Sequence, residues 1–264
     1  MIEKCNNKDL KRIEEYIDVH YPTCLYLYLD VKKYGPDSDL TKSFFIYENN
    51  KLKGVILLYH TAMHLFSKNN DFNKDEVRDF VIYHNPSMIC AAKETILTLQ
   101  DEFTSLGFYA EYGHVGQFIS LDKKSQMTPQ LAKTKDIEGI ANLLYQDDDI
   151  GASYHLNDLK QQIKERLEQG FVRSYVIKEG NKVICHVGTG AETDKVCTIA
   201  YCVTDPSYRG RGLFSSLLAY ACEKLSQEGK EIYSIYYPEN SRLLHHKVGF
   251  KDYCECGKLF RKVD

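Results

Sequence analysis

The sequence has no excess of positive charge. Its 264 residues include 34 lysines and arginines against 37 aspartates and glutamates, a formal net charge of −3. Without a net positive field, the chain has no general means of holding nucleic-acid phosphates or of docking on an anionic membrane. We therefore expect neither nucleic acid nor a membrane among its partners.

Long apolar runs and low-complexity tracts are also absent. The most apolar stretch, Val55 to Leu65, is too short to span a bilayer, which takes about 20 residues, and it contains two histidines. The first four residues, Met-Ile-Glu-Lys, carry charge where a secretion signal would need an apolar run. Together with an ordinary hydrophobic content of 43%, these absences predict a folded, cytoplasmic protein.

The nine cysteines include no Cys-x-x-Cys pair, a spacing typical of metal and redox sites. Their odd number fits a reducing compartment better than a disulfide framework. Most lie in apolar strings such as Val183-Ile184-Cys185, where a thiol behaves as a small hydrophobic group. His60 and His64 would lie about 13 Å apart on one extended strand, too far to share an ion. We predict cysteines in the core and no metal.

The order of patterns along the chain predicts a duplicated α/β (α+β) fold, with a mixed central sheet flanked by helices. The polar stretch from Asp122 to Pro129 is the best linker candidate, and we place the domains at residues 1–124 and 125–264. Two predicted hairpins resemble one another, because the segment from Phe45 to Lys51 can be laid over the segment from Val176 to Lys182. Turns favour such residues in any case, so chance similarity remains an alternative.

In the first half we expect a helix opening at about Lys8, a hairpin of residues 44–47 and 55–59, and a helix of residues 87–103 closed by Gly107. In the second half we expect helices at 136–145 and 157–167, a hairpin of 171–177 and 183–187, a strand at 197–204, a helix at 213–227, a strand at 231–236, a short helix at 241–247 and a last strand pair.

The stretch from Tyr201 to Phe214, YCVTDPSYRGRGLF, carries the most chemical information. A strand enters a tight turn in which Gly210 and Gly212 permit positive φ, and the turn opens an amphipathic helix. Such a turn directs unpaired backbone N–H groups to one point, with the positive end of the helix dipole behind them. Arg209 and Arg211 add positive charge. The pattern predicts a phosphate site, and the alternative is a plain surface turn.

These residues resemble a known family. Arg209-Gly210-Arg211-Gly212 is similar to the R/Q-x-x-G-x-G/A signature of the GCN5-related N-acetyltransferases (GNATs), with Phe214 in place of the final Gly/Ala. A Val-x-x-Pro-x-Tyr-Arg lead precedes it, and Lys247-Val248-Gly249-Phe250 is similar to the family's closing K-x-G-F. The resemblance covers about residues 129 to 262.

The resemblance implies acetyl-CoA as co-substrate. Its pyrophosphate would lie on the backbone N–H groups of Arg209, Gly210, Arg211, Gly212, Leu213 and Phe214. Its pantetheine arm would pair with the strand that ends at Val203. By family analogy, the N–H of Cys202 or Val203 would hold the oxyanion. Asn240, two residues from the place where the family has an Asn, is a weaker candidate for a contact with CoA, or it caps a helix starting at Ser241.

Acetyl transfer to an amine also needs proton transfer, because an alkyl amine of pKa about 10.4 is mostly protonated at neutral pH. The carboxylate nearest to the strand is Glu192, a candidate base that could equally be an ordinary turn acid. His245 stands where the family has a Tyr that protonates the thiolate, and the alternative is a partly exposed helix histidine. Tyr201 is a spare acid. His186 fits a hydrogen-bonded core residue better.

No glycine lies between Gly54 and Gly107, so a phosphate turn in the first half, expected near His84-Asn85-Pro86, could not readily form. We interpret this half as a degenerate acetyltransferase-like domain, with an unrelated helical ligand sensor as the alternative.

The sequence predicts a cytoplasmic enzyme, an N-acetyltransferase that moves acetyl from acetyl-CoA to a primary amine by direct attack. The alternative is a non-catalytic acyl-CoA-binding regulator. An aminoacyl transferase is disfavoured by the net charge. The identity of the amine-bearing acceptor and the oligomeric state stay open, a homodimer included.

Overall fold

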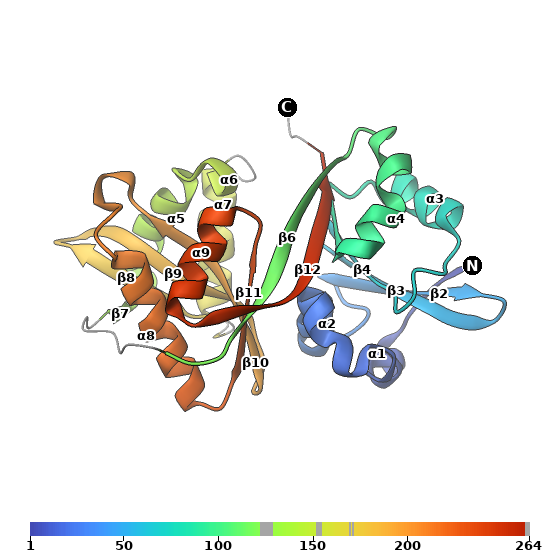
Figure 1. The fold of residues 1–264 in the computed structure, drawn as a ribbon, viewed down its shortest axis with the longest axis horizontal. Helices are drawn as coiled ribbons and strands as arrows, with labels where there is room; N and C mark the ends of the chain where they lie inside the picture. The colour runs from blue at the N-terminus through green and yellow to red at the C-terminus, as the bar shows by residue number, and fades with distance from the viewer. Residues whose placement is uncertain (122–128, 152–154, 169, 171, 262–264) are drawn as a thin grey trace. The chain divides into compact units, whose positions relative to one another are not determined.

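A computed structural model describes residues 1–121, 129–151, 155–168, 170 and 172–261 (Figure 1). The chain forms two compact units. The first comprises Met1–Val115 with the described residues from Asp252 on, and the second comprises Gly116–Lys251. Strands β6 (Tyr109–Phe118) and β12 (Phe250–Phe260) each begin in one unit and end in the other. The predicted boundary at residue 124 lies outside the described residues. The predicted second domain, residues 125–264, includes the last strand, whereas most of β12 belongs to the first unit.

The first unit is a mixed sheet with strand order β1-β2-β3-β4-β5-β12-β6. Strands β1 to β4 form an antiparallel meander, and β5 runs parallel to β4. Its elements in chain order are β1 (Ile2–Lys4), α1 (Leu10–Ile17), α2 (Leu25–Tyr34), β2 (Thr41–Glu48), β3 (Lys51–Tyr59), β4 (Ala62–Phe66), α3 (Lys74–His84), β5 (Met88–Ala92), α4 (Lys93–Thr104) and β6.

The second unit repeats this order of strands and helices, with the sheet order β6-β11-β10-β9-β8-β7. Strands β7 to β10 are antiparallel, and β11 runs parallel to β10. Its elements are β7 (Gln130–Leu131), α5 (Ile137–Tyr145), α6 (Asp148–Gly151), α7 (Leu156–Glu168), β8 (Ser174–Glu179), β9 (Lys182–Glu192), β10 (Val196–Thr204), α8 (Leu213–Gln227), β11 (Glu231–Tyr236), α9 (Glu239–Val248) and β12. The predicted duplicated fold is confirmed.

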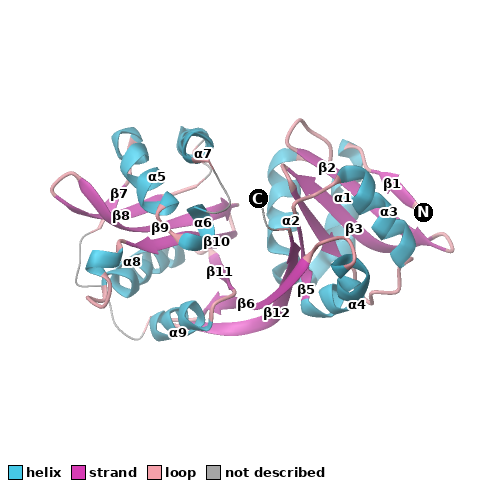
Figure 2. Ribbon diagram, turned by 90° about the horizontal axis from the view of Figure 1, so that it is seen from above, coloured by secondary structure: helices cyan, strands magenta, loops and turns pink. Residues whose placement is uncertain are grey.

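Each unit has helices on both faces of its strands (Figure 2). In the first unit, Phe44 and Ile46 of β2 pack with residues of α3 and α4, whereas Phe45 packs with residues of α1 and α2. This alternation is the period of two that a strand buried on both faces requires. In the second unit, one apolar cluster contains α8 and another contains α5 and α7.

Local signals predicted many of these elements, and both hairpins, α8 and β11 lie where expected. The predicted helix at 87–103 was wrong in its first turns, because residues 88–92 form β5 and the helix begins at Lys93. Ile89 and Ala91 are buried while their neighbours are partly exposed, as in a strand. Helix α3 and strand β6 were not predicted.

The prediction that His60 and His64 share a strand was also wrong. His60 lies in the turn between β3 and β4 with φ of +50°, and His64 lies in β4. Among the described residues, no group of three or more His, Cys, Asp or Glu side chains is placed to hold a metal ion. All nine cysteines are free, with five of them buried. None of the helices built from described residues is long and apolar enough to cross a bilayer.

Candidate functional site

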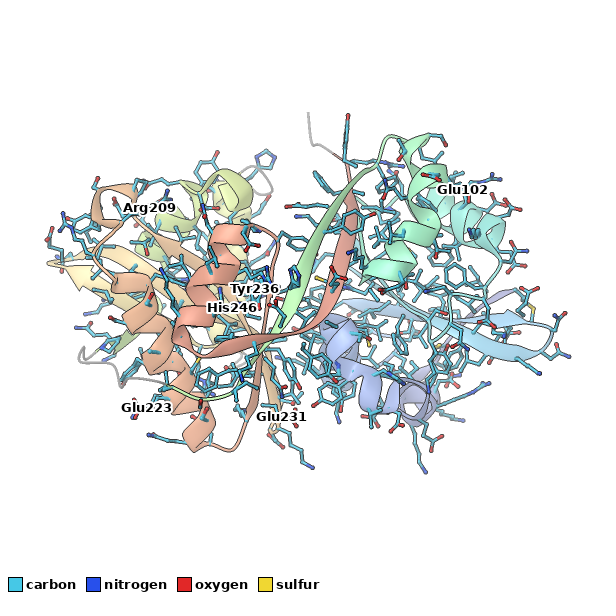
Figure 3. The ribbon with its side chains drawn as sticks, in the orientation of Figure 1. Glu102, Arg209, Glu223, Glu231, Tyr236 and His246 are labelled. Atoms are coloured by element: carbon cyan, nitrogen blue, oxygen red, sulfur yellow. The ribbon has the colours of Figure 1, made fainter. Side chains whose placement is uncertain are left out.

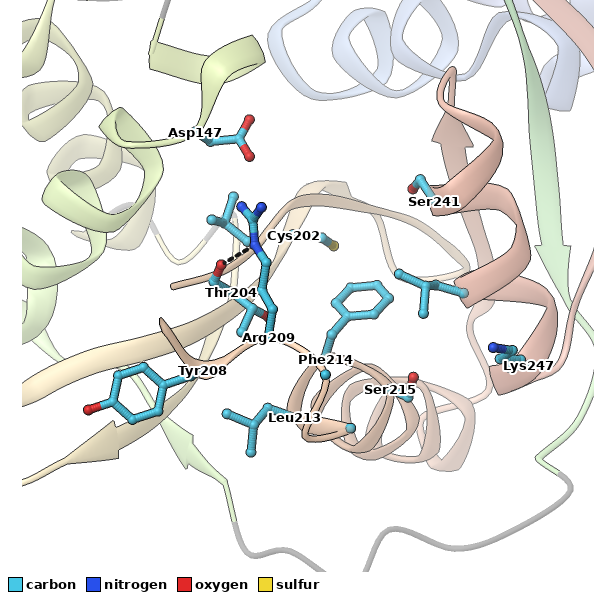
Figure 4. A pocket seen from close by; sticks show the side chains of 14 residues that line it. Asp147, Cys202, Thr204, Tyr208, Arg209, Leu213, Phe214, Ser215, Ser241 and Lys247 are labelled. Carbon is cyan, nitrogen blue, oxygen red and sulfur yellow. Dashed lines mark hydrogen bonds between the residues drawn. The ribbon is translucent and has the colours of Figure 1, made fainter. Parts of the chain in front are cut away.

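The second unit contains a cavity of about 530 Å³, a size typical of small-ligand sites (Figure 4). Strand β10, the glycine turn, α8 and α9 form most of its wall. The lining residues are Cys202, Val203, Thr204, Tyr208, Arg209, Gly210, Gly212, Leu213, Phe214, Ser215, Ser241, Leu244, Lys247 and, before α6, Asp147.

The cavity lies where two parallel strands separate. Strands β10 and β11 pair from Val196 to Ile199, but β10 continues to Thr204. Within the described residues, the last part of β10 therefore has no register partner on its β11 side. An extended ligand can add to such an edge through main-chain hydrogen bonds.

The glycine turn has the predicted conformation. Gly210 and Gly212 have φ of +76° and +72°, and a Cβ atom at either position would meet no atom within 4 Å. Gly212 is the N-cap of α8, whose N-terminus has no side-chain cap and no acidic residue in its first turn. The first N–H groups of α8 therefore face open space at the positive end of the helix dipole, as an anion site requires.

The equivalent turn of the first unit differs in this respect. It lies between β4 and α3, at residues 67–73, so the expected position near residues 84–86 was wrong. Here the Asn73 side chain accepts the N–H of Glu76 at 3.2 Å, and Asp75 and Glu76 place two carboxylates in the first turn. A side-chain cap and negative charge thus occupy the place where a phosphate would bind.

Side-chain contacts hold the turn of the second unit in place. The buried Asp205 carboxylate accepts the N–H of Ser207 at 2.9 Å and pairs with Lys182 at 2.6 Å. The hydrogen bond from Lys182 lowers the pKa of Asp205. Arg209 donates from Nε to the carbonyl of Thr204 at 3.1 Å (Figure 4). The β8–β9 hairpin, which supplies Lys182, therefore anchors the glycine turn.

Most of the predicted coenzyme-binding residues line this cavity, but Arg211 and Asn240 are not among the lining residues. Arg211 donates to the carbonyl of Ser207 at 3.2 Å and stacks on Tyr208. The idea that Asn240 caps the helix was wrong, because α9 begins at Glu239 with Pro238 as its N-cap.

Sequence reasoning missed the contribution of α9 to the cavity. Ser241, Leu244 and Lys247 line it at intervals of three residues, which place them on one face of the helix. That spacing could have identified them. Tyr236 and His246 lie near one another where β11 meets α9 (Figure 3), with ring centroids 6.3 Å apart.

His245 is buried and is not one of the lining residues. Its Nδ1 lies 2.8 Å from the carbonyl oxygen of Ser241 and its Nε2 lies 3.0 Å from Oγ of Ser234. Because a carbonyl can only accept, Nδ1–H donates, and Nε2 accepts from the serine hydroxyl. Burial lowers its pKa to about 4. The alternative of a partly exposed helix histidine was wrong, and the ring joins α9 to β11.

Glu192 lies at the far end of β9. It pairs with Cys197 in register, six residues before Val203, a strand distance of about 20 Å. Its carboxylate accepts two hydrogen bonds from Arg173, at 3.1 and 2.7 Å, and one from Thr189 at 2.6 Å. The structure does not bring Glu192 to the cavity.

Tyr201 lies in a bulge of β10 next to the lining residue Cys202. Its φ is +55°, and its hydroxyl accepts a hydrogen bond from Arg166 at 3.1 Å. Tyr201 itself is not one of the lining residues. Of the three predicted proton-transfer residues, Tyr201 is the only one on the strand that borders the cavity.

Several known proteins that resemble this chain belong to one family. Residues 138–250 match the model of the acetyltransferase (GNAT) family. A GNAT-family acetyltransferase from Colwellia psychrerythraea is similar in structure, with a TM-score of 0.63 and 12% identity over 99% of this chain and all of the other. A GCN5-related N-acetyltransferase-like protein from Streptococcus suis gives a TM-score of 0.64 and 13% identity, covering 96% and 99% of the two chains.

A tandem GNAT protein from the clavulanic acid biosynthesis pathway is also similar, with a TM-score of 0.55 and 9% identity over 98% of this chain and 97% of the other. At such identities these likenesses establish the fold alone. No curated protein matches the sequence significantly.

Proposed function

Because residues 138–250 match the model of the acetyltransferase (GNAT) family, we propose that the protein transfers acetyl from acetyl-CoA to a primary amine. Family and tandem fold support an acyltransferase in general terms. The observation that carries the proposal is the uncapped N-terminus of α8, which opens into the cavity through two glycines of positive φ.

The residues present fit the coenzyme. The N–H groups from Gly210 to Phe214 would hold the pyrophosphate, and the guanidinium of Arg209 adds a positive charge on the cavity wall. The free edge of β10 would pair with the pantetheine arm. Bound there, acetyl-CoA supplies a thioester, the activated acyl group of the reaction.

The acceptor amine must lose a proton before it attacks. Asp147 is the one carboxylate among the lining residues, and Figure 4 shows its side chain directed into the space above Arg209. One of its oxygens accepts the N–H of Ile150 at 3.3 Å, which fixes the carboxylate at the start of α6. We assign Asp147 to attract the ammonium form of the acceptor and to accept its proton directly or through water.

The departure of CoA from the tetrahedral intermediate does not require a dedicated acid. Both ring nitrogens of His245 are engaged, and the Tyr201 hydroxyl accepts from Arg166. A thiol has a pKa of about 8.5, so the leaving group can depart as the thiolate near neutral pH. Proximity of amine and thioester then supplies much of the rate.

The test combines calorimetry with turnover. We expect heat of association with both CoA and acetyl-CoA, and release of the CoA thiol with at least one member of a panel of polyamines, aminoglycosides, amino acids and peptides with a free amino terminus. Absence of binding would contradict the proposal. Binding without thiol release across the panel would favour a non-catalytic regulator instead.

The matched variants are Asp147→Asn and Asp158→Asn, the latter an exposed aspartate of α7. We expect Asp147→Asn to lower kcat/KM for the amine about 100-fold, the lower end of the usual contribution of a general base, without changing the affinity for CoA. Asp158→Asn should change neither. Equal activity of the two variants would remove Asp147 from the mechanism.

A further inference from the structure

His186 is a buried histidine of β9 for which the proposed reaction has no direct use. Its Nδ1 lies 2.6 Å from the carbonyl oxygen of Tyr201, and its Nε2 lies 3.0 Å from Oγ of Ser174. The carbonyl can only accept, so Nδ1 carries the proton and Nε2 accepts from the serine hydroxyl. Burial lowers the pKa of His186 to about 4, which keeps the ring neutral and this tautomer in place at neutral pH.

The carbonyl that His186 holds belongs to a strained bulge. Ala200 pairs with Gly188 and Val203 pairs with His186, so three steps along β10 match two steps along β9. Tyr201, inside this bulge, has φ of +55°, a conformation that is unfavourable for a residue with a bulky side chain. The surrounding contacts must therefore compensate for this strain, and the 2.6 Å hydrogen bond from His186 is made to the carbonyl of Tyr201 itself.

Gly188 leaves space for the hydrogen bond between His186 and Tyr201. A Cβ atom on Gly188 would lie 3.0 Å from Cε1 of His186, closer than most real contacts of a Cβ. A glycine at position 188 therefore leaves room for the imidazole of His186 to reach the carbonyl of Tyr201 on β10.

The hydrogen bond from His186 fixes the orientation of the peptide group between Tyr201 and Cys202. In a trans peptide the C=O and the next N–H point in opposite directions. With the carbonyl of Tyr201 held by the side chain of His186, the N–H of Cys202 points away from His186, on a part of β10 where pairing with β11 has already ended at Ile199. Cys202 is one of the residues that line the cavity.

We propose that His186 is a positioning residue, which holds the carbonyl of Tyr201 and thereby directs the N–H of Cys202 at the thioester carbonyl of bound acetyl-CoA. This inference rests on the proposed function. In the tetrahedral intermediate the carbonyl oxygen becomes an oxyanion, and a fixed N–H donor stabilises it more than the starting thioester.

The test compares His186→Ala with Val187→Ala, a truncation of the neighbouring buried residue on the same strand. We expect His186→Ala to lower kcat about 100-fold, the typical effect of losing one oxyanion donor, while the affinity for CoA stays within twofold. Val187→Ala should lower Tm but leave kcat of the folded protein unchanged. Tyr201→Gly in the His186→Ala background should restore about tenfold in kcat, because glycine adopts positive φ without strain.

A second readout is the amide ¹⁵N–¹H signal of Cys202. It should shift more with acetyl-CoA than with CoA in the wild-type chain, and equally with both in His186→Ala. Unchanged kcat and an unchanged Cys202 response in His186→Ala would overturn the positioning role. A wild-type chain that binds neither compound would overturn the proposed function, and the positioning role with it.

Discussion

Replacing Gly212 by alanine is the most direct perturbation of the glycine turn. The residue has φ of +72°, and an alanine in the left-handed region costs about 1–2 kcal/mol. Gly229, in the turn just after α8, provides a matched control. Its φ is +76°, and like Gly212 it has no atom within 4 Å of an added Cβ. Both variants should therefore lose about 1–2 kcal/mol of unfolding free energy, or about 2–8 °C in Tm.

The two variants should differ in their affinity for CoA. At Gly212 the strain acts on the N–H groups that would hold the pyrophosphate, and a hydrogen bond to a charged group contributes about 1.5–3 kcal/mol. Loss of one such bond weakens binding by about 10–100-fold. Gly229 lies outside the cavity lining, so its variant should bind as the wild type does. Titration calorimetry with CoA and thermal melting measure both quantities. Equal affinities, with Tm lowered in both variants, would refute the assignment of the turn.

Further predictions concern stability. Arg173→Met should lower the unfolding free energy by about 2 kcal/mol in urea titrations, because it removes the main partner of the partly buried Glu192, and should leave CoA affinity intact. Gly249→Ala should lower Tm more than Gly229→Ala, because its Cβ would lie 1.8 Å from the carbonyl oxygen of Ser120, and an equal Tm would contradict this packing. The two buried histidines of the second unit have pKa values of about 4 against 6.5 in the unfolded chain, so the unfolded chain binds more protons between these values. The contribution of these two histidines to the unfolding free energy should be fully present above pH 6.5 and fall by about 3 kcal/mol per pH unit as the pH drops towards 4, and equal unfolding free energies at pH 7.5 and 5.0 would exclude this linkage.

Sequence reasoning succeeded where a signal is local. Glycines at 210 and 212, followed by the apolar stripe of α8, specify a turn and a helix through residues close in the chain, and the structure has both. It failed at residues 88–92, where a short apolar run fits a strand and a buried helix turn equally well. Pairing with β4 and β12 decides between them, and no nearby residue reports that pairing.

The proton-transfer residues show a second limit. Glu192 is the carboxylate nearest to β10 in sequence, but strand geometry carries it about 20 Å from the cavity and into an ion pair with Arg173. Asp147 lies about 50 residues before β10 and still lines the cavity, because α5 ends just before it. Distance along the chain is therefore a poor guide to which carboxylate faces a ligand.

The sequence by itself determined the repeated α/β pattern, the glycine turn and the family resemblance of the second half, because each depends on the conformational preferences and spacing of neighbouring residues. Only the tertiary structure decided that His245 is buried, that Asp147 joins the cavity and that His186 reaches the carbonyl of Tyr201. These properties depend on which strands pair and in what register, and register is set by packing summed over the whole sheet.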